Sequence, residues 1–416
     1  MSLPLEVLNT GTELLLGAVL NTHLRFFAEA LFPLGLRIQR QLTVPDGPAI
    51  ADNLRDCFPR CRVLLITGGL GPTTDDITRE AVAELLGLRL VHDETIMEAI
   101  RARFARRNLP LSARVELQAL RPPEATVLTN EHGTAPGLYL PPLPVPGSQI
   151  LSPHLFLLPG PPRELKPMFE QSVIPILRSL LPSDPVCEKL TLKVLGLGES
   201  MVEEKVGADL LALGVELGYC ARPGEVDVRV IGTPAQIQQA EELIRSRIGA
   251  HVVCADERSI EKILVDLLTE RSLTLATAES CTGGSIAHHI TNVPGSSAVF
   301  RCGWVTYAND AKTRDLGVPE ELLQKHGAVS EPVATAMASG ALARSGADFA
   351  AATTGIAGPG GGSPEKPVGT IFIALARKDG PVRCHRFQFR TERESFKALA
   401  TQTTLNLLRE AILASD

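Results

Sequence analysis

Apolar runs and amphipathic stretches alternate along the first 90 residues of the chain. Three segments have the length and apolar pattern of strands: residues 5–8, 37–44 and 62–66. Three others place apolar residues at helical spacing: residues 22–34, 49–58 and 76–86. Strands that alternate with helices predict an α/β fold with a doubly wound parallel sheet. Ligands of such sheets bind beyond the carboxyl ends of the strands.

The rest of the chain shows the same patterns in another order. A small α+β unit is predicted from strands and helices at residues 188–195, 199–211, 215–221, 227–231 and 234–248. A three-layer α/β domain is predicted from strands at 273–276, 348–353, 370–376 and 382–389, with helices at 261–270, from 320, from 331 and at 392–413. We therefore expect three domains, which are residues 1–182, 183–256 and 257–416.

The strongest candidate for chemistry is the turn at residues 277–284, which leads from a buried strand into a helix. The first N–H groups of a helix have no intrahelical partner, so such a turn favours a nucleophile or an anionic ligand. Ser280 and Cys281 are the two candidate nucleophiles, and by chemistry alone the thiol is the stronger. The structural alternative is that Ser280 or Thr282 caps the helix and Cys281 fills a small apolar gap.

Two further strand ends carry polar groups that suit acyl transfer. The segment 304–312 begins as a strand and is expected to end in a polar turn that presents Tyr307 and Lys312. The segment 351–362 is a strand that enters a glycine-rich loop, where the N–H groups near Thr354 and Gly355 are candidates for holding an oxyanion. A lysine can serve as the base of a serine only if burial or a nearby cation lowers the pKa of its amine.

The first domain contains its own candidate site, the glycine-rich loop at residues 67–76. Backbone N–H groups of such a loop can approach a phosphate, and the candidates are Gly68, Gly69, Gly71 and Thr73. It is not a Walker loop, because no Gly-Lys-Ser/Thr follows. Asp75 and Asp76 could hold a divalent metal ion on a pyrophosphate or, alternatively, could cap the next helix.

Composition narrows the class of protein. The 416 residues are 44% hydrophobic but only 4% aromatic, which predicts aliphatic cores. The net charge of −6 argues against a general nucleic-acid binder. Eight scattered cysteines suggest buried thiols in a reducing compartment. No basic segment leads into an apolar run at the start, so we expect a cytoplasmic protein.

The motifs of the last domain resemble the CinA (competence/damage-inducible protein A) family. The resemblance rests on the three segments above and on residues 327–331 and 366–370. It implies a nicotinamide mononucleotide deamidase that needs no cofactor, with Ser280 as nucleophile, Lys312 as base and Tyr307 orienting or relaying the proton. It also assigns oxyanion or substrate contacts to Gly283, Gly284, Thr354, Gly355 and Arg393. The family's second cation after Arg393 is replaced here by Lys397.

The first domain resembles the molybdopterin-binding-like domain of the same family. Matching motifs are residues 11–13, Asp46, 67–80, 133–137 and 159–162. The resemblance implies an ADP-ribose pyrophosphatase that depends on a divalent metal ion of unknown identity, with Glu13, Asp75 and Asp76 as ligands. His23 and Val115 stand where related chains carry asparagine, which would weaken this activity if either asparagine contacts ligand.

The middle unit resembles the family's KH-like linker domain. KH modules clamp nucleic acid through a Gly-x-x-Gly loop, and Gly196 and Gly198 have the wrong spacing, so nucleic acid is not an expected partner. The expected partners are nicotinamide mononucleotide, ADP-ribose and a second copy in a homodimer, with no membrane. Two alternatives remain open: pyrophosphate hydrolysis as the main activity, or a non-catalytic nucleotide-sensing protein linked to competence or DNA damage.

Overall fold

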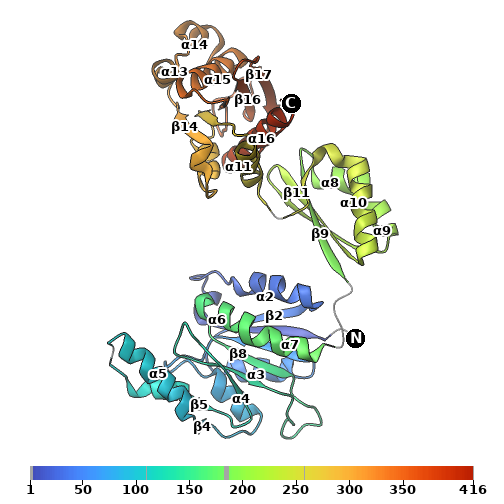
Figure 1. The fold of residues 1–416 in the computed structure, drawn as a ribbon, viewed down its shortest axis with the longest axis vertical. Helices are drawn as coiled ribbons and strands as arrows, with labels where there is room; N and C mark the ends of the chain where they lie inside the picture. The colour runs from blue at the N-terminus through green and yellow to red at the C-terminus, as the bar shows by residue number, and fades with distance from the viewer. Residues whose placement is uncertain (1–2, 109, 182–186, 257, 416) are drawn as a thin grey trace. The chain divides into compact units, whose positions relative to one another are not determined.

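The computed structural model describes residues 3–108, 110–181, 187–256 and 258–415. The chain divides into two compact units, residues 1–186 and 187–416, called unit 1 and unit 2 below. In Figure 1, unit 1 is coloured from blue to green and unit 2 from green to red. No helix within the described part of the chain is long and apolar enough to span a membrane.

Unit 1 is built on a six-stranded sheet with the order β2-β1-β3-β8-β7-β6 (Figure 1). Its strands are β1 (Leu5–Thr10), β2 (Ile38–Val44), β3 (Val63–Thr67), β6 (Thr126–Leu128), β7 (Gly137–Leu140) and β8 (His154–Leu158). The strands β2, β1 and β3 run parallel, as predicted, and β8 adds a fourth parallel strand, whereas β7 and β6 extend the sheet in antiparallel fashion. A separate two-stranded sheet pairs β4 (Val91–His92) with β5 (Leu120–Arg121).

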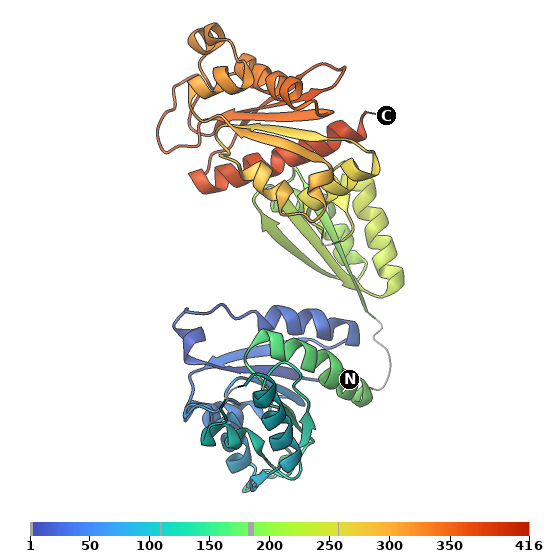
Figure 2. The same cartoon turned by 60° about the vertical axis from the view of Figure 1, so that its left-hand side comes forward.

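Two layers of helices cover the sheet of unit 1. They are formed by α2 (His23–Leu31), α3 (Ala49–Cys57), α4 (Thr78–Leu85), α6 (Pro162–Met168) and α7 (Ile174–Leu180). Unit 1 also contains α1 (Thr12–Leu15) and α5 (Glu94–Arg106), which packs in a separate small core. Alternate residues of β3 enter opposite cores, because side chains alternate along a strand. Leu64 packs with α3 and α4, and Leu65 packs with α2, α6 and α7. Figure 2 shows α2 beside α6 and α7 on one side of the sheet.

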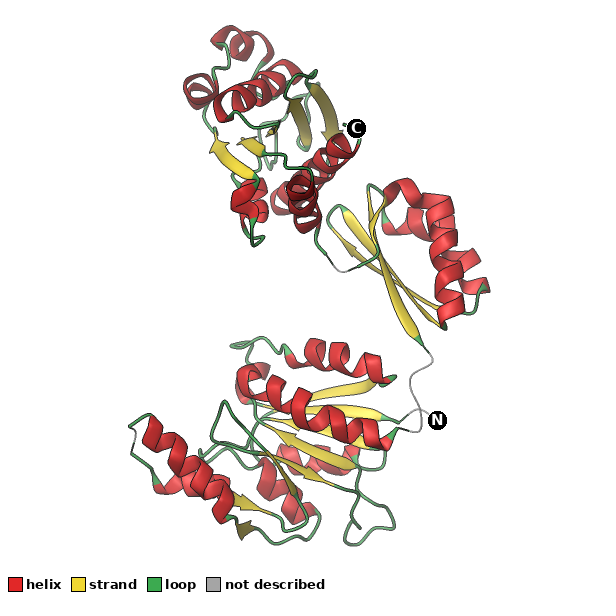
Figure 3. Cartoon of the chain, viewed as in Figure 1, coloured by secondary structure: helices red, strands yellow, loops and turns green. Residues whose placement is uncertain are grey.

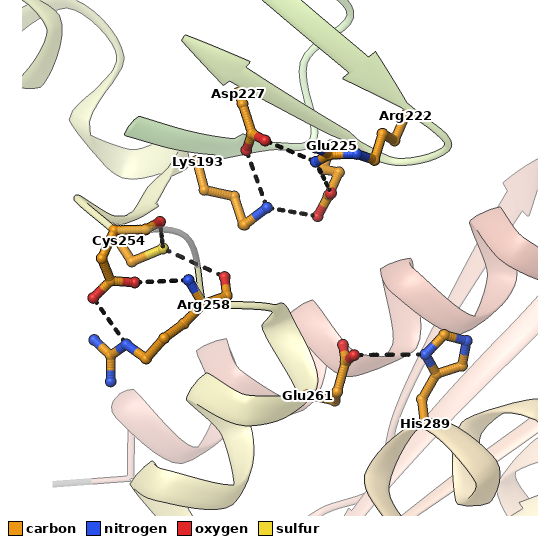
Figure 4. Close-up of polar contacts among 9 residues, drawn as sticks. Lys193, Arg222, Glu225, Asp227, Cys254, Arg258, Glu261 and His289 are labelled. Carbon is orange, nitrogen blue, oxygen red and sulfur yellow. Dashed lines mark hydrogen bonds and ion pairs between the residues drawn. The ribbon is translucent and has the colours of Figure 1, made fainter. Parts of the chain in front are cut away.

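The first part of unit 2 is a small domain with a four-stranded sheet. Its strand order β10-β11-β9-β12 joins β9 (Glu188–Leu195), β10 (Glu216–Arg222), β11 (Glu225–Gly232) and β12 (Val252–Cys254). Figure 3 shows its helices, α8 (Glu199–Val202), α9 (Ala208–Ala212) and α10 (Pro234–Ile248), on one side of the strands. The opposite face carries an ion-pair network in which Lys193 lies 3.1 Å from Glu225 and 3.0 Å from Asp227 (Figure 4). The alternation along β9 and β11 therefore separates an apolar core from a charged face.

The last part of unit 2 is a three-layer α/β domain. Its sheet has the order β14-β13-β15-β16-β17, with β13 (Leu275–Glu279), β14 (Phe300–Val305), β15 (Phe349–Gly355), β16 (Thr370–Arg377) and β17 (Arg383–Gln388). The helices are α11 (Ile260–Glu270), α12 (Ser285–Thr291), α13 (Asn309–Leu316), α14 (Glu320–His326), α15 (Glu331–Ser345) and α16 (Arg393–Leu413). Ala351 faces the core shared with α11, α12 and α16, and Ala350 and Ala352 face the core shared with α15.

The sequence-based prediction of the fold class is confirmed, and the structure adds three details. Helices α1, α5, α6 and α7 and strands β4, β5, β8 and β12 are among the elements that were not predicted. Lys312 lies inside helix α13, whereas the sequence suggested a polar turn. Two of the cysteines expected to be buried, Cys187 and Cys220, are exposed, and all eight are unpaired.

Candidate functional site

Ser280 stands directly after β13, where three parallel strands end together. β13 pairs in parallel with both β14 and β15, so the loops after these strands lie at one edge of the sheet. The N–H of Ser280 donates to the carbonyl oxygen of Thr353 at 3.0 Å, which ties the loop to the end of β15. The predicted convergence of strand ends is therefore present.

Lys312 reaches this loop from α13. Its Nζ lies 3.2 Å from Oγ of Ser280 and donates to the carbonyl oxygens of Thr306 at 2.8 Å and Tyr307 at 3.3 Å. The residue is only 1% exposed, and burial lowers the pKa of its ammonium group. No carboxylate forms an ion pair with Lys312 within the described residues. A buried amine without a counter-ion beside a hydroxyl is chemically suited to accept the proton of that hydroxyl.

Cys281 is not available as a nucleophile at neutral pH. Its side chain is buried in the core shared with α11 and α16, and burial raises the pKa of its thiol to about 12. Because the thiolate is the reactive form of cysteine, this environment makes the thiol inert. The structure therefore gives Cys281 the packing role and leaves the half-buried Ser280 as the candidate nucleophile.

The N–H groups at the start of α12 were expected to be free to bind an anionic ligand, but Glu279 accepts hydrogen bonds from them. Its buried carboxylate accepts the N–H groups of Gly284 at 2.9 Å, Ile286 at 3.1 Å and Ala287 at 2.8 Å. The first N–H groups of α12 therefore face an internal anion, which is favoured there by the helix dipole. The expected oxyanion or substrate contact at Gly284 is corrected accordingly, because its N–H is already bound.

The N–H of Gly283 is also already hydrogen-bonded, because it donates to the carbonyl oxygen of Ser280 at 3.2 Å. Both glycines adopt positive φ values, 64° for Gly283 and 93° for Gly284, and so shape the turn by conformation. A Cβ at Gly283 would lie 3.7 Å from the Nζ of Lys397, so this ammonium group is near the turn.

Thr354 and Gly355 lie at the end of β15, next to Ser280. The hydroxyl of Thr354 is buried and donates to the carbonyl oxygen of Ala328 at 2.8 Å, which makes this side chain a brace for the 327–331 segment. The carbonyl of Thr353 faces β13, and residues two apart in a strand direct their backbone groups to the same edge. The N–H of Gly355 therefore points toward the Ser280 loop.

Tyr307 and Arg393 form a contact at the rim of the site. Arg393 begins α16 and donates to the phenol oxygen of Tyr307 at 2.8 Å and to the carbonyl oxygen of Gly358 at 2.9 Å. Tyr307 is 60% exposed. Among the described residues, its hydroxyl is hydrogen-bonded to Arg393 and to neither Ser280 nor Lys312. Only the backbone carbonyl of Tyr307 contacts the lysine.

Helix α12 also forms an ion pair with the neighbouring helix α11. His289 lies 3.7 Å from Glu261 of α11, and this carboxylate raises the pKa of the imidazole (Figure 4). The pair links two helices that cover the same face of the sheet. His289 therefore supports the position of α12, and among the described residues it makes no contact with Ser280.

The loops after β1, β3 and β8 of unit 1 enclose a cleft of about 380 Å³. It brings together predicted residues that are distant in the sequence: Glu13, Gly68, Gly69, Gly71, Asp75 and Asp76. The glycines are sterically required, because a Cβ at Gly68 would lie 2.6 Å from the carbonyl oxygen of Thr10. The N–H of Gly68 donates to the carbonyl oxygen of Leu158, so this group is not available to a phosphate.

The carboxylates of this cleft have different surroundings. Asp76 accepts the N–H of Thr73 at 2.9 Å and also its hydroxyl, so it braces the loop and does not cap α4, whose first flanking residue is Ile77. Asp75 is exposed, and the neighbouring hydroxyl group of Thr73 lowers the pKa of its carboxyl. Within the described ranges, no group of three or more His, Cys, Asp or Glu side chains is placed to hold a metal ion. The metal site stays a prediction.

The structure identifies cleft residues that sequence reasoning did not select. Glu164, from α6, and Gln118 both line the cleft, and the Oε1 of Gln118 is buried without a hydrogen-bond partner among the described residues. His23 is buried, with Nδ1 3.4 Å from the hydroxyl of Thr67, whereas Val115 packs in a separate core beside α5. Asp46 and Glu279 lie within motifs that the sequence analysis identified, and those motifs were the signal that could have found them.

Models of known families match three stretches of the chain. The description "CinA C-terminal domain" matches residues 257–412, "Probable molybdopterin binding domain" matches residues 6–179, and "Damage-inducible protein CinA KH domain" matches residues 189–252.

Individual relatives cover almost the whole chain. A CinA-like protein of Akkermansia muciniphila is 47% identical over 98% of this chain and 97% of its own length. A CinA-like protein of Geobacter sp. strain M21 is 42% identical, with coverage of 98% and 97%. The crystal structure of the competence/damage inducible protein CihA from Agrobacterium tumefaciens is 44% identical and covers 38% of this chain and 99% of its own, with a TM-score of 0.36. From the full-length relatives and the three matched domains, we conclude that the chain belongs to the CinA family.

Proposed function

We propose that unit 2 hydrolyses the carboxamide of nicotinamide mononucleotide to nicotinate mononucleotide and ammonia. The observation that carries this proposal is the 3.2 Å contact between Oγ of Ser280 and Nζ of Lys312, a lysine that is buried without a carboxylate partner among the described residues. Burial lowers the pKa of the amine, which increases the neutral fraction that can act as a base.

The proposed reaction uses this pair twice. Lys312 accepts the hydroxyl proton while Oγ of Ser280 bonds to the carboxamide carbon, and the carbonyl oxygen becomes an oxyanion. When the C–N bond breaks, Lys312 returns the proton and ammonia leaves from an ester on Ser280. A water molecule then adds to the ester carbon, Lys312 takes its proton, and the serine is released with that proton.

The surrounding groups suit the charges of this substrate. The N–H of Gly355 points toward the Ser280 loop and is the backbone donor we assign to the oxyanion. Arg393 and the ammonium group of Lys397 lie one helical turn apart on α16 beside the same loop, where a nucleotide phosphate would be neutralised. Glu279 accepts hydrogen bonds from the N–H groups at the start of α12, so these groups do not compete with Gly355 for the oxyanion.

Ammonia release from nicotinamide mononucleotide tests this function directly. The purified full chain should release ammonia, Ser280→Ala should abolish the release, and Cys281→Ser should retain most of it because the thiol is buried. Binding of the nucleotide without any ammonia would instead support the nucleotide-sensing alternative. Loss of activity in Cys281→Ser with retention in Ser280→Ala would reverse the assignment of the nucleophile.

We further propose that the cleft of unit 1 hydrolyses the pyrophosphate of ADP-ribose with a divalent metal ion. The supporting observation is that Glu13, Asp46, Asp75 and Asp76 line the same cleft as the glycine loop. Mg²⁺ is commonly bound through one or two carboxylates together with substrate phosphates, so three protein ligands are not needed. Asp75 and Glu13 are the exposed donors that fit such a site. The ion would supply charge neutralisation on the phosphate oxygens.

A further inference from the structure

A second cavity of unit 1, about 770 Å³ in volume, lies between helix α5 and the loop that joins β6 to β7. One face of α5 forms a wall of it, with Thr95, Ala99, Arg103 and Arg106 three or four residues apart. Thr134 of the opposite loop lines both this cavity and the glycine-loop cleft. The volume is in the range of about 300–1,000 Å³ that small-molecule sites occupy.

Arg103 extends into the cavity with part of its guanidinium unsatisfied. One terminal nitrogen donates to the carbonyl oxygen of Glu131 at 2.7 Å. The Nε is buried and has no hydrogen-bond partner among the described residues. A buried N–H of this kind is costly unless an acceptor enters the site. The position and chemistry of Arg103 therefore favour a ligand with oxygen acceptors.

Two arginines, Arg103 and Arg106, and two acids, Asp93 and Glu131, line this cavity. Arg103, Arg106 and Arg107 form no ion pair with a carboxylate in the described ranges. The carboxylate of Asp93 is already engaged, because it lies 2.6 Å from Arg121 and accepts two N–H groups of α5. A further acid near Arg103, Glu164, accepts a hydrogen bond from the side-chain amide of Asn130. Burial and the nearby Arg107 lower the pKa of Arg103, although Glu164 acts in the opposite direction. An anion in the cavity would relieve this repulsion.

We propose that the cavity binds the phosphate group of an organic phosphate of the nucleotide class. Arginine presents planar N–H donors that match phosphate oxygens, and its charge strengthens each hydrogen bond. The loop that carries Asn130 is fixed from within, since the side-chain amide donates to Ala135 and Glu164 and the amide oxygen accepts the N–H of Gly133. The wall opposite Arg103 is thus formed before any ligand enters. This site does not depend on the proposed deamidase.

Isothermal titration of the full chain with inorganic phosphate, AMP and ADP tests the proposal. Arg103→Gln should weaken the binding of AMP or ADP by about tenfold or more, as expected for a lost charge-assisted hydrogen bond. Arg106→Gln should also weaken it, and Arg103→Lys should retain part of it. Arg101→Gln is the matched control: it removes the same charge from the same helix, but Arg101 pairs with Glu94 and does not line the cavity.

The outcomes separate the possible sources of the anion. Nucleotide binding that is much tighter than the binding of inorganic phosphate, and that depends on Arg103, supports a nucleotide site. Equal affinities for the nucleotides and inorganic phosphate would show that the cavity recognises only the phosphate group. Unchanged binding in both Arg103→Gln and Arg106→Gln, an equal loss in Arg101→Gln, or no binding of any of the three probes would overturn the proposal. So would arginine-dependent binding of a single-stranded oligonucleotide without binding of AMP. If Arg103→Gln fails to fold, Arg106→Gln, at an exposed position, decides the question.

Discussion

The guanidinium of Arg393 donates a 2.8 Å hydrogen bond to the phenol oxygen of Tyr307. Tyr307 is thereby held at the rim of the site while its hydroxyl points to a cation and not to the proposed nucleophile or base. Under the proposed function, this geometry favours a substrate-binding role for Tyr307 and Arg393 together. It does not support the expectation that Tyr307 relays a proton.

Tyr307→Phe should therefore lower kcat by less than about tenfold and act mainly by raising KM, because the variant loses one hydrogen bond to Arg393. A proton relay would instead contribute about 10²–10⁴-fold to the rate. The measurement is steady-state ammonia release from nicotinamide mononucleotide. A collapse of kcat with an unchanged KM would restore the relay role.

Glu279 should be important for both stability and activity. Glu279→Ala removes the acceptor of three N–H groups, and each unsatisfied donor costs about 1–3 kcal/mol when buried. Because two of these groups are only partly buried, we expect a loss of about 3 kcal/mol in the free energy of unfolding, with ammonia release also impaired. Urea denaturation measures the loss, with Glu320→Ala as an exposed control on α14. Equal stabilities of the two variants would contradict this role.

Lys312 should make the stability of the protein depend on pH. Burial lowers its pKa in the folded state below the ordinary value of 10.5, so the unfolded state binds this proton more tightly. The resulting penalty on folding is fully present below the folded-state pKa and disappears as pH rises through 10.5. The free energy of unfolding of the wild type, minus that of Lys312→Met, should therefore increase with pH over this window. A constant difference would show that the pKa of Lys312 is not lowered.

Removal of divalent metal should separate the two proposed activities. With a chelator present, the full chain should lose ADP-ribose hydrolysis and retain ammonia release from nicotinamide mononucleotide. Asp75→Asn should also reduce ADP-ribose hydrolysis, because Asp75 is an exposed carboxylate of the cleft. The control is Asp52→Asn, an exposed acid on α3 outside the cleft. ADP-ribose hydrolysis that survives the chelator unchanged would remove the metal from the mechanism.

The sequence predicted the fold class and the meeting of Ser280 with Lys312, because strand ends and a family motif mark both positions. It could not predict which N–H groups are already bound. The loss of Gly284 as a donor depends on the side-chain direction of Glu279, which is known only from the folded structure. Arg103 was missed for a similar reason, since α5 was not predicted and its cavity forms only when the β6–β7 loop lies opposite.

The central claim is that a neutral Lys312 removes the proton of Ser280, and the pH dependence of kcat for wild type and Lys312→Arg tests it most directly. Arginine keeps the positive charge but stays protonated at every accessible pH. We therefore expect Lys312→Arg to lose about 10²-fold or more in kcat at all pH values, with KM largely unchanged. The wild type should show a basic limb that this variant lacks. If Lys312 only binds the substrate phosphate, Lys312→Arg will keep a substantial kcat with an unchanged limb, and the general-base role is contradicted.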